Sequence, residues 1–366
     1  MGLGAIVVPG MERGGTRGPE CAHAAQNSPA SLAYLNLLGR SPVERIVERF
    51  VRAEVDVVSV LCKPGEFSGV KPSFTAFENV EHYCVPDLSR GVEDKLREYS
   101  EKGIDHAFLL FGNLYAETDL LDFFYFHRES RRNATRSVIR EEPLDLWAVR
   151  CCAAQDQDLS RLLANSELGA NAYLIRDYVN QLAGFRDFRR FAADLLQGRC
   201  FVRPPGREVK RGIWIDDEAE VHRQARIVAP AYVGRRSRVL QDTLITRASS
   251  VEKDCCIDYG TVIEDTSVLQ NTEIGICLDV CHAIANGSKL VSLDRDVVIE
   301  ISDPAVMHSN TADRGSAKER RWARNVLLFG RKKQPRQAPV TLQPAASAPE
   351  PSRFEIHSLR GESDVQ

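Results

Sequence analysis

An aliphatic residue falls at every sixth position between residues 215 and 269, and a small residue follows four positions after each of the first nine. A helix has a period near 3.6 and a strand a period of two, so neither explains this spacing. The six-residue unit predicts short flat strands separated by tight turns, with one aliphatic side chain inward per strand and a small residue at each corner. Three units complete a triangular coil, and coils stack at about 4.8 Å, the spacing of parallel strands. The aliphatic residues are Ile215, Val221, Ile227, Val233, Val239, Ile245, Val251, Ile257, Ile263 and Leu269. The small residues are Ala219, Ala225, Ala231, Ser237, Thr243, Ser249, Cys255, Thr261 and Ser267.

Residues 1–205 follow a different pattern, in which apolar runs alternate with helical periodicity. A buried strand is predicted at 5–8, and Ser41, Pro42 and Glu44 form a helix start with a capping box. A second strand is predicted at 55–61, which implies a right-handed parallel crossover.

The same alternation continues with a strand at 106–111 and a helix from Leu120 to Arg128. Further strands are predicted at 146–150 and 172–175, followed by a helix over 178–196. The fold class is therefore α/β, with an N-terminal Rossmann-like three-layer domain and a mostly parallel sheet.

The chain divides at the Pro-rich link 203–206 into an α/β domain over 1–205 and a repeat domain over 211–303. After Leu269 the period falters, and we expect one more irregular coil with a closing strand, because solenoid ends need a cap. Residues 304–330 are predicted to form a basic helical segment, and the Pro- and Ser-rich residues 331–366 a disordered tail. The basic stretch 318–333 favours a helix packed on the solenoid over one lying on an anionic membrane.

Composition narrows the function classes. The net charge of −3 gives no reason to expect nucleic acid as a partner. The sequence has neither a signal-peptide pattern nor a run of 18 apolar residues, so we expect a cytoplasmic protein without a transmembrane segment. The ten cysteines are then expected to be reduced thiols. Cys277, Cys281 and His282 could begin a metal site, but they lack a second ligand pair, and no metal site is predicted.

The repeat resembles the hexapeptide-repeat family, which folds as a left-handed parallel β-helix. An α/β domain followed by such coils resembles the nucleotide-sugar pyrophosphorylases, including mannose-1-phosphate guanylyltransferases. Residues 5–17 (AIVVPGMERGGTR) resemble that family's first strand and Gly-rich loop, and 37–50 (LLGRSPVERIVERF) its helix start. Residues 108–134 resemble the strand end and following helix in which the family carries an Asp.

The resemblance implies binding of a nucleotide or sugar phosphate. The phosphate-binding candidates that it implies are Gly10, Gly14, Gly15, Thr16, Arg17 and Asn113. A Gly-rich turn with a surface Arg is the alternative reading of the loop.

The departures from the family concern its charged groups. No lysine precedes Lys63, neutral Asn113 replaces the family's metal-binding Asp, and residues 201–210 contain no Asp. Loss of one such charge costs about 10²- to 10³-fold in rate. We therefore predict no catalytic residues, and Mg²⁺ as a cofactor only if the site is active.

The leading prediction is a catalytically degraded pyrophosphorylase-like protein that binds a nucleotide, a sugar phosphate or a partner in polysaccharide or cell-envelope sugar biosynthesis. One alternative is an active sugar-1-phosphate nucleotidyltransferase with a rearranged site. Another is a hexapeptide acyltransferase using His222 or His282 as a base, although a surface role suits His222 better. A homo-oligomer, dimer or trimer, is expected through the β-helix.

Overall fold

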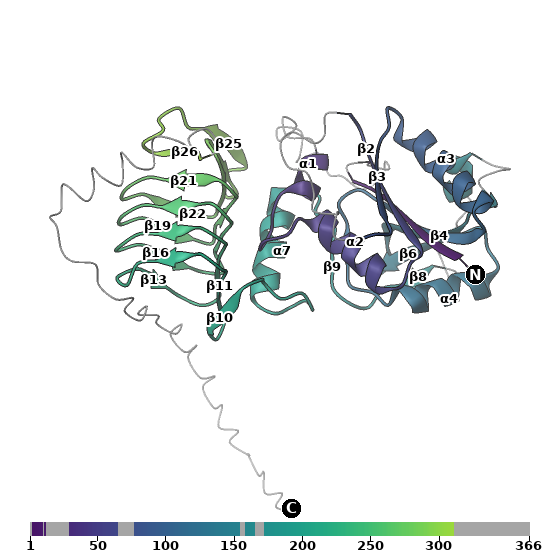
Figure 1. Ribbon diagram of the computed structural model, residues 1–366, viewed down its shortest axis with the longest axis horizontal. Helices are drawn as coiled ribbons and strands as arrows, with labels where there is room; N and C mark the ends of the chain where they lie inside the picture. The colour runs from purple at the N-terminus through teal and green to yellow at the C-terminus, as the bar shows by residue number, and fades with distance from the viewer. Residues whose placement is uncertain are drawn as a thin grey trace, which may run out of the picture.

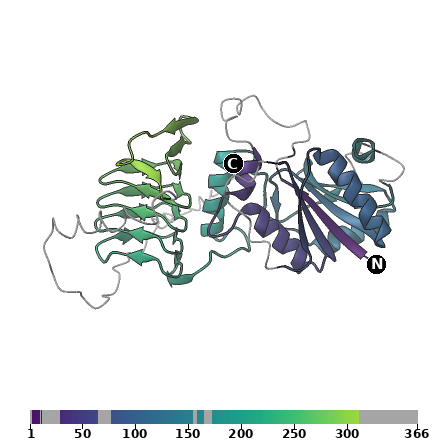
Figure 2. The ribbon, with the colours of Figure 1, turned by 45° about the horizontal axis from the view of Figure 1, so that its top comes forward.

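The protein consists of a sheet with helices on both faces beside a column of stacked coils (Figures 1 and 2). The computed structural model describes residues 2–9, 11, 29–64, 77–153, 158–164 and 172–310. The class is mixed α/β, with parallel strands in several sheets, as the sequence predicts.

The front domain is built on a seven-stranded sheet of order β3-β2-β1-β4-β7-β6-β8. The first four strands are parallel, whereas β7 runs antiparallel to both β4 and β6. β8 is parallel to β6, so the sheet has a parallel half and a mixed half. The strands are β1 (Gly2–Val8), β2 (Val57–Cys62), β3 (Val80–Cys84), β4 (Ile104–Phe111), β6 (Ala134–Ile139), β7 (Glu142–Arg150) and β8 (Tyr173–Leu174).

Helices cover both faces of this sheet and give it three layers. Alternate side chains of β1 enter two separate cores: Ala5 and Val7 pack with α2, α4 and α7, and Ile6 and Val8 with α3 and α6. The helices are α1 (Pro29–Tyr34), α2 (Pro42–Arg52), α3 (Leu88–Glu101), α4 (Leu120–Ser130), α6 (Leu159–Ala164) and α7 (Phe185–Leu196). None of these helices is both long and apolar enough to cross a membrane.

The predicted start of α2 is confirmed. The Ser41 hydroxyl accepts a hydrogen bond from the Glu44 backbone N–H at 3.3 Å, and the Glu44 carboxylate accepts one from the Ser41 N–H at 2.8 Å. Asp119 caps α4 by accepting from two backbone N–H groups of its first turn. Both caps satisfy amides that have no partner inside the helix.

The predicted helix over 178–196 is wrong in its first third. Residues Val179–Asn180 form β9, which pairs antiparallel with β5 (Tyr115–Ala116), and α7 begins only at Phe185. The Asn180 side chain accepts a hydrogen bond from the Leu182 N–H, a local bond that turns the chain away from a helix.

The repeat region forms coils whose strands lie in three parallel sheets. Strands of one sheet are separated by 18 residues in the first coils, so three six-residue units make one turn as predicted. The first sheet contains β11 (Ile213–Ile215), β14 (Ala231–Val233), β17 (Ser250–Val251), β20 (Ser267–Val268) and β23 (Ala283–Asn286). The second contains β12 (Glu220–Val221), β15 (Arg238–Val239), β18 (Cys256–Ile257) and β21 (Thr272–Ile274). The third contains β13 (Arg226–Ile227), β16 (Leu244–Thr246), β19 (Val262–Glu264) and β22 (Asp279–Cys281).

The period shortens by one residue before Leu269, not after it as the sequence suggests. Val251 pairs with Val268, a separation of 17, so Val268 occupies the inward position and joins the solenoid core. Leu269 packs instead in the core shared with the front domain. Ser267 lies in β20 opposite Ser250, and Thr266 takes the corner predicted for Ser267.

The ends of the coil are closed by antiparallel strands. β10 (Arg207–Lys210) pairs with β11 at one end, and β24 (Lys289–Ser292) and β25 (Val297–Glu300) extend the first sheet beyond β23. β26 (Met307–Ser309) pairs with β21. These strands confirm an irregular last coil with closing strands. The basic helical segment predicted over 304–330 is wrong for residues 304–310, which form a turn and β26 because they pair with β21. The rest of that segment and the predicted tail lie outside the described residues.

Hydroxyl groups at the corners connect one coil to the next. The fully buried Thr261 Oγ1 donates to the Gly275 carbonyl at 2.6 Å and accepts from the Leu278 N–H at 3.2 Å. Ser237, Ser249 and Thr266 make equivalent pairs of bonds. At these four corners the side chain therefore supplies a hydroxyl as well as a small volume, whereas the alanine corners supply the small volume alone.

Replacing Thr261 with Val should destabilise the solenoid by roughly 2 kcal/mol, because a buried N–H and a buried carbonyl lose their partner while the side-chain shape is kept. Urea unfolding of the purified chain measures this change. Thr246→Val, at a half-buried threonine of β16, is the matched control and should cost less than about 0.5 kcal/mol. Equal losses in both variants would contradict a special role for the corner hydroxyls.

Candidate functional site

A tight turn at Leu38 and Gly39 lies between the front domain and the solenoid. The Leu37 N–H donates to the Arg40 carbonyl at 2.9 Å, and both central residues have positive φ, 51° and 80°. Gly39 is required for space as well, because a Cβ there would lie 2.6 Å from the Pro205 ring.

Two buried charged side chains hold this turn from opposite sides. Glu252, at the end of β17, accepts hydrogen bonds from the N–H groups of Leu38 (2.6 Å) and Gly39 (2.9 Å). Arg45 of α2 donates to the carbonyls of Leu37 (2.7 Å) and Leu38 (2.8 Å). Burial raises the pKa of Glu252 to about 7 and lowers the pKa of Arg45, while the bonds to the turn and the charge of Arg45 oppose the shift of Glu252.

A second buried arginine joins α7 to the solenoid. Arg189 is 4% exposed and donates to the carbonyls of Arg247 and Ala248 and to the Asp265 carboxylate. Apolar solenoid side chains also enter the core on the α2 and α7 side of the sheet. They are Tyr232, Ala248, Leu269, Ile284 and Val291. We call this contact between front domain and solenoid the seam, and α7 lies along it in both ribbon views (Figures 1 and 2).

A cavity of about 370 Å³ opens beside the turn, between α2 and residues 201–205. Its lining contains five guanidinium groups and a single carboxylate, that of Glu48, which leaves four net positive charges. The guanidinium groups belong to Arg40, Arg45, Arg49, Arg52 and Arg203. Such an excess in a confined volume favours an anion.

The cavity arginines differ in how far they are already neutralised. Glu48 forms ion pairs with both Arg40 and Arg52. Arg49 donates to the Thr118 carbonyl at 2.6 Å, and among the described residues neither Arg49 nor Arg203 has a carboxylate partner. Arg49 and Arg203 therefore keep N–H groups available to a bound oxyanion. The Nε of Arg45 also has no hydrogen-bond partner in the described part of the chain, but it is buried and not open to the cavity.

An aromatic ring lies at the same cavity. Phe201 is 83% exposed, and its backbone N–H donates to both oxygens of the buried Glu117 carboxylate, at 2.8 and 3.0 Å. Tyr115, which also lines the cavity, donates to Glu117 at 3.0 Å. The backbone at Phe201 is thus fixed while its ring is open to solvent.

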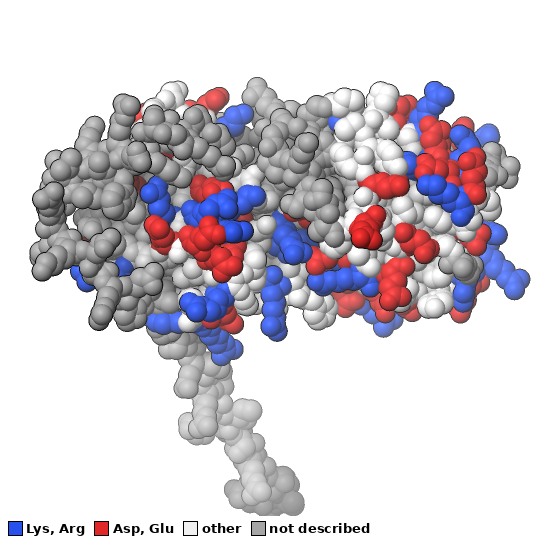
Figure 3. Space-filling model, viewed as in Figure 1, with Lys and Arg blue, Asp and Glu red and all other residues white. Residues whose placement is uncertain are grey.

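The charge in the cavity contrasts with the outer surface. On the face drawn in Figure 3, positive and negative side chains are interspersed over the coloured part of both the solenoid and the front domain. The concentration of one sign is a property of the cavity and not of that face.

Of the predicted phosphate-binding residues, the structure describes only Asn113. Asn113 follows β4 at the carboxyl edge of the sheet, where the Gly112 N–H donates to the Val8 carbonyl, and its side chain is 6% exposed. It does not line the arginine cavity. Gly10, Gly14, Gly15, Thr16 and Arg17 lie outside the described residues.

The histidines considered as bases have local partners. The His282 Nδ1 lies 2.7 Å from an oxygen of Asp265, whose other oxygen binds Arg189 at the seam. The His222 Nδ1 accepts a hydrogen bond from the Gln224 N–H at 3.3 Å. Cys277 and Cys281 do not join His282 in a metal-ligand group; among the described residues such a group is formed only by Cys62, His82 and Cys84.

No protein-family model matches the chain, and no curated protein is detectably similar to it. The resemblance to nucleotide-sugar pyrophosphorylases therefore stays a prediction from the motifs quoted above.

The arginine cavity is absent from the predictions above, although the sequence contains a signal for it. Arg45, Arg49 and Arg52 recur at spacings of four and three in the helix predicted from Ser41, which places them on neighbouring positions of α2. Arg203 lies in the predicted link, far from α2 in the sequence, and reaches the cavity only because the folded chain brings the link beside α2.

The free energy of unfolding should fall as pH rises from about 4.5 to about 7, because folded Glu252 keeps its proton where an unfolded glutamate has lost it. The total loss of unfolding free energy from this group is roughly 3 kcal/mol, and above pH 7 the group adds no further change. Urea unfolding at pH 5 and pH 8 measures the difference, and Glu252→Gln should reduce it. The exposed Glu218→Gln is the control; a pH difference unchanged by Glu252→Gln would rule out this assignment.

Proposed function

We propose that the protein is a nucleotide-sugar pyrophosphorylase-like binding protein that has lost efficient catalysis and holds a sugar phosphate or a nucleotide in the arginine cavity. The observation that carries the proposal is the set of five guanidinium groups around one carboxylate in about 370 Å³. Guanidinium groups bind phosphate oxygens through paired, charge-assisted hydrogen bonds.

The shape of the cavity supports a phosphorylated small molecule. Its volume lies in the range of pockets that hold small ligands, roughly 300–1,000 Å³. Arg49 and Arg203 offer N–H groups to a phosphate, and the exposed Phe201 ring can stack on a sugar or base. The ligand would contact both α2 and the link to the solenoid, so its binding would strengthen the seam.

The chemistry of the lining argues against nucleotidyl transfer in this cavity. That reaction needs carboxylates to hold Mg²⁺ against the phosphates. Glu48 is the one carboxylate of the lining, and both of its oxygens are engaged by arginines. At the carboxyl edge of the sheet, Asn113 offers a neutral amide. The arrangement therefore favours binding of a phosphorylated ligand over nucleotidyl transfer.

The solenoid and the metabolic role of the protein are part of the same proposal. We propose that the coils wind left-handed, as in the hexapeptide-repeat family, and that they mediate self-association. A role in polysaccharide or cell-envelope sugar metabolism follows from the resemblance, since that is where such ligands are made and consumed.

Thermal-shift and calorimetric titrations with sugar 1-phosphates, nucleoside diphosphates and nucleotide sugars should identify a ligand that stabilises the chain. Arg49→Gln should weaken its binding by about tenfold, the loss of one charge-assisted bond. Glu48→Gln should tighten binding, because it frees Arg40 and Arg52 from their ion pairs.

The control for the charge change is Arg235→Gln, which removes an exposed guanidinium from the solenoid. It should leave the affinity unchanged. Parallel losses in Arg49→Gln and Arg235→Gln would indicate non-specific attraction. Unchanged affinity in both Arg49→Gln and Glu48→Gln would place the ligand elsewhere.

Incubation with nucleoside triphosphates, Mg²⁺ and sugar 1-phosphates should release no pyrophosphate above the protein-free background. Coupled detection of pyrophosphate measures this, with a panel of the four common bases. Release that requires Mg²⁺ and disappears in Arg17→Ala would instead establish an active nucleotidyltransferase that uses the Gly-rich loop.

A further inference from the structure

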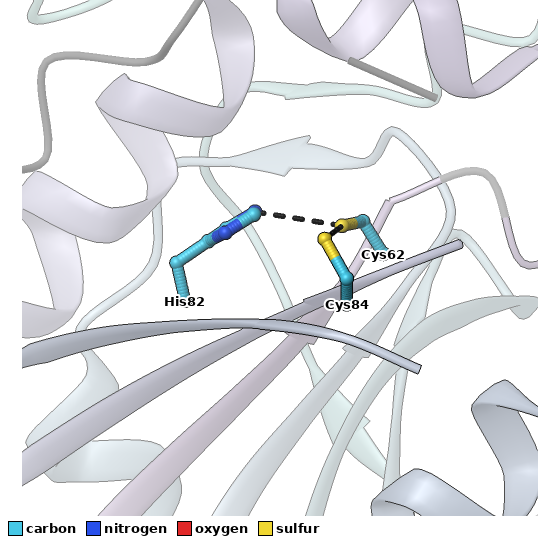
Figure 4. A group of neighbouring side chains, drawn as sticks. All are labelled: Cys62, His82 and Cys84. Atoms are coloured by element: carbon cyan, nitrogen blue, oxygen red, sulfur yellow. Dashed lines mark hydrogen bonds between the residues drawn. The ribbon is translucent and has the colours of Figure 1, made fainter. Parts of the chain in front are cut away.

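Three potential metal ligands converge at one corner of the front sheet, away from the arginine cavity. Cys62 is the last residue of β2, and His82 and Cys84 lie on the neighbouring edge strand β3. Their ligand atoms all lie within 4.8 Å of one another. Figure 4 shows the imidazole and both thiols directed toward a common point.

The strand register explains this convergence. Cys62 is paired with Cys84 and Val60 with His82 in the parallel β2–β3 ladder. Paired residues of adjacent strands share a face of the sheet, as do residues two apart on one strand. Sequence positions 62, 82 and 84 are therefore brought to the same face by pairing alone.

The distances approach those of a tetrahedral zinc site. The Cys62 Sγ lies 3.5 Å from the His82 Nε2 and 3.2 Å from the Cys84 Sγ. Zinc bonds of about 2.3 Å to sulfur and about 2.0 Å to nitrogen give tetrahedral edges of about 3.6 Å (S–N) and about 3.8 Å (S–S). The distance between the Cys62 Sγ and the His82 Nε2 already matches the S–N edge. The sulfurs of Cys62 and Cys84 would have to separate by about half an ångström to reach the S–S edge.

We propose that Cys62, His82 and Cys84 bind a divalent transition-metal ion of the zinc type. Thiolate and imidazole are the ligand types that such ions prefer, and three protein ligands leave a fourth position for water or a ligand. Cys62 is buried and anchors the site, whereas His82 and Cys84 are exposed and leave a route for the ion. Each thiol that becomes a ligand releases its proton to solvent.

A disulfide between Cys62 and Cys84 is the competing explanation for two thiols at paired positions. It would account for the sulfurs but gives no reason for the His82 imidazole to point at them. It would also need the sulfurs to approach from 3.2 Å to about 2.0 Å, the opposite movement from metal binding. The two explanations predict different behaviour of the reduced chain.

The test is a Co²⁺ titration of the full-length, metal-free chain under a non-chelating reductant, followed by displacement with Zn²⁺. One equivalent of Co²⁺ should produce a thiolate-to-cobalt charge-transfer band, and Zn²⁺ should remove it. Cys84→Ser and His82→Gln should each weaken binding at least about tenfold, and Cys84→Ser should also weaken the band.

The matched control is Cys277→Ser, an exposed cysteine of the solenoid, which should bind Co²⁺ like the unmodified chain. Far-UV circular dichroism checks that each variant folds, and His82→Gln provides the test if Cys84→Ser does not fold. Absence of the band in the reduced chain would overturn the proposal, as would a band that persists in Cys84→Ser and His82→Gln. A Cys62–Cys84 cross-link in the unreduced chain together with no metal binding after reduction would establish the disulfide. None of these results depends on whether the arginine cavity binds a phosphate.

Discussion

The clamp on the Leu38–Gly39 turn is the interaction on which the rest of the arrangement depends. A carboxylate from the solenoid binds the amides of the turn, and a guanidinium from α2 binds its carbonyls. Both side chains are buried, and removal of either would leave backbone groups of the turn without a partner, at a cost of about 1–3 kcal/mol for each buried group. The turn therefore fixes where α2 lies relative to the solenoid, and with it the wall of the arginine cavity.

The solenoid holds Glu252 in position to bind the turn. Its interior is an aliphatic column and its corners are joined by hydroxyl bonds, so each coil is held by the next. The missing residue before β20 matters at the seam, because it turns Leu269 outward into the core shared with the front domain. A local defect in the repeat thus supplies part of the contact that joins the two halves.

Local patterns predicted the elements well and their long-range pairing less well. The six-residue period, the capping box at Ser41 and the strand at 106–111 follow from neighbouring residues, and the structure confirms them. The helix predicted from residue 178 failed at its start because the Asn180 side chain accepts a hydrogen bond from the Leu182 N–H, a bond that the helical pattern does not reveal. The antiparallel β7 and the shift from Leu269 to Val268 likewise depend on pairing partners far away in the sequence.

The candidate sites were still harder to predict. Arg45 and Glu252 are charged residues that a sequence reading assigns to the surface, yet tertiary contacts bury both. Cys62 and Cys84 lie 22 residues apart and meet only through the β2–β3 register. The loop containing Gly14 to Arg17 carries the family resemblance but lies outside the described residues, so its part in binding remains a prediction.

A crystal structure of the chain with its stabilising sugar phosphate or nucleotide bound would show directly whether the arginine cavity holds the ligand. Phosphate oxygens should lie against Arg49 and Arg203, with the ligand ring on Phe201. Density for the phosphate at the carboxyl edge of β1 and β4, beside Asn113, with the arginine cavity holding only solvent, would contradict this placement.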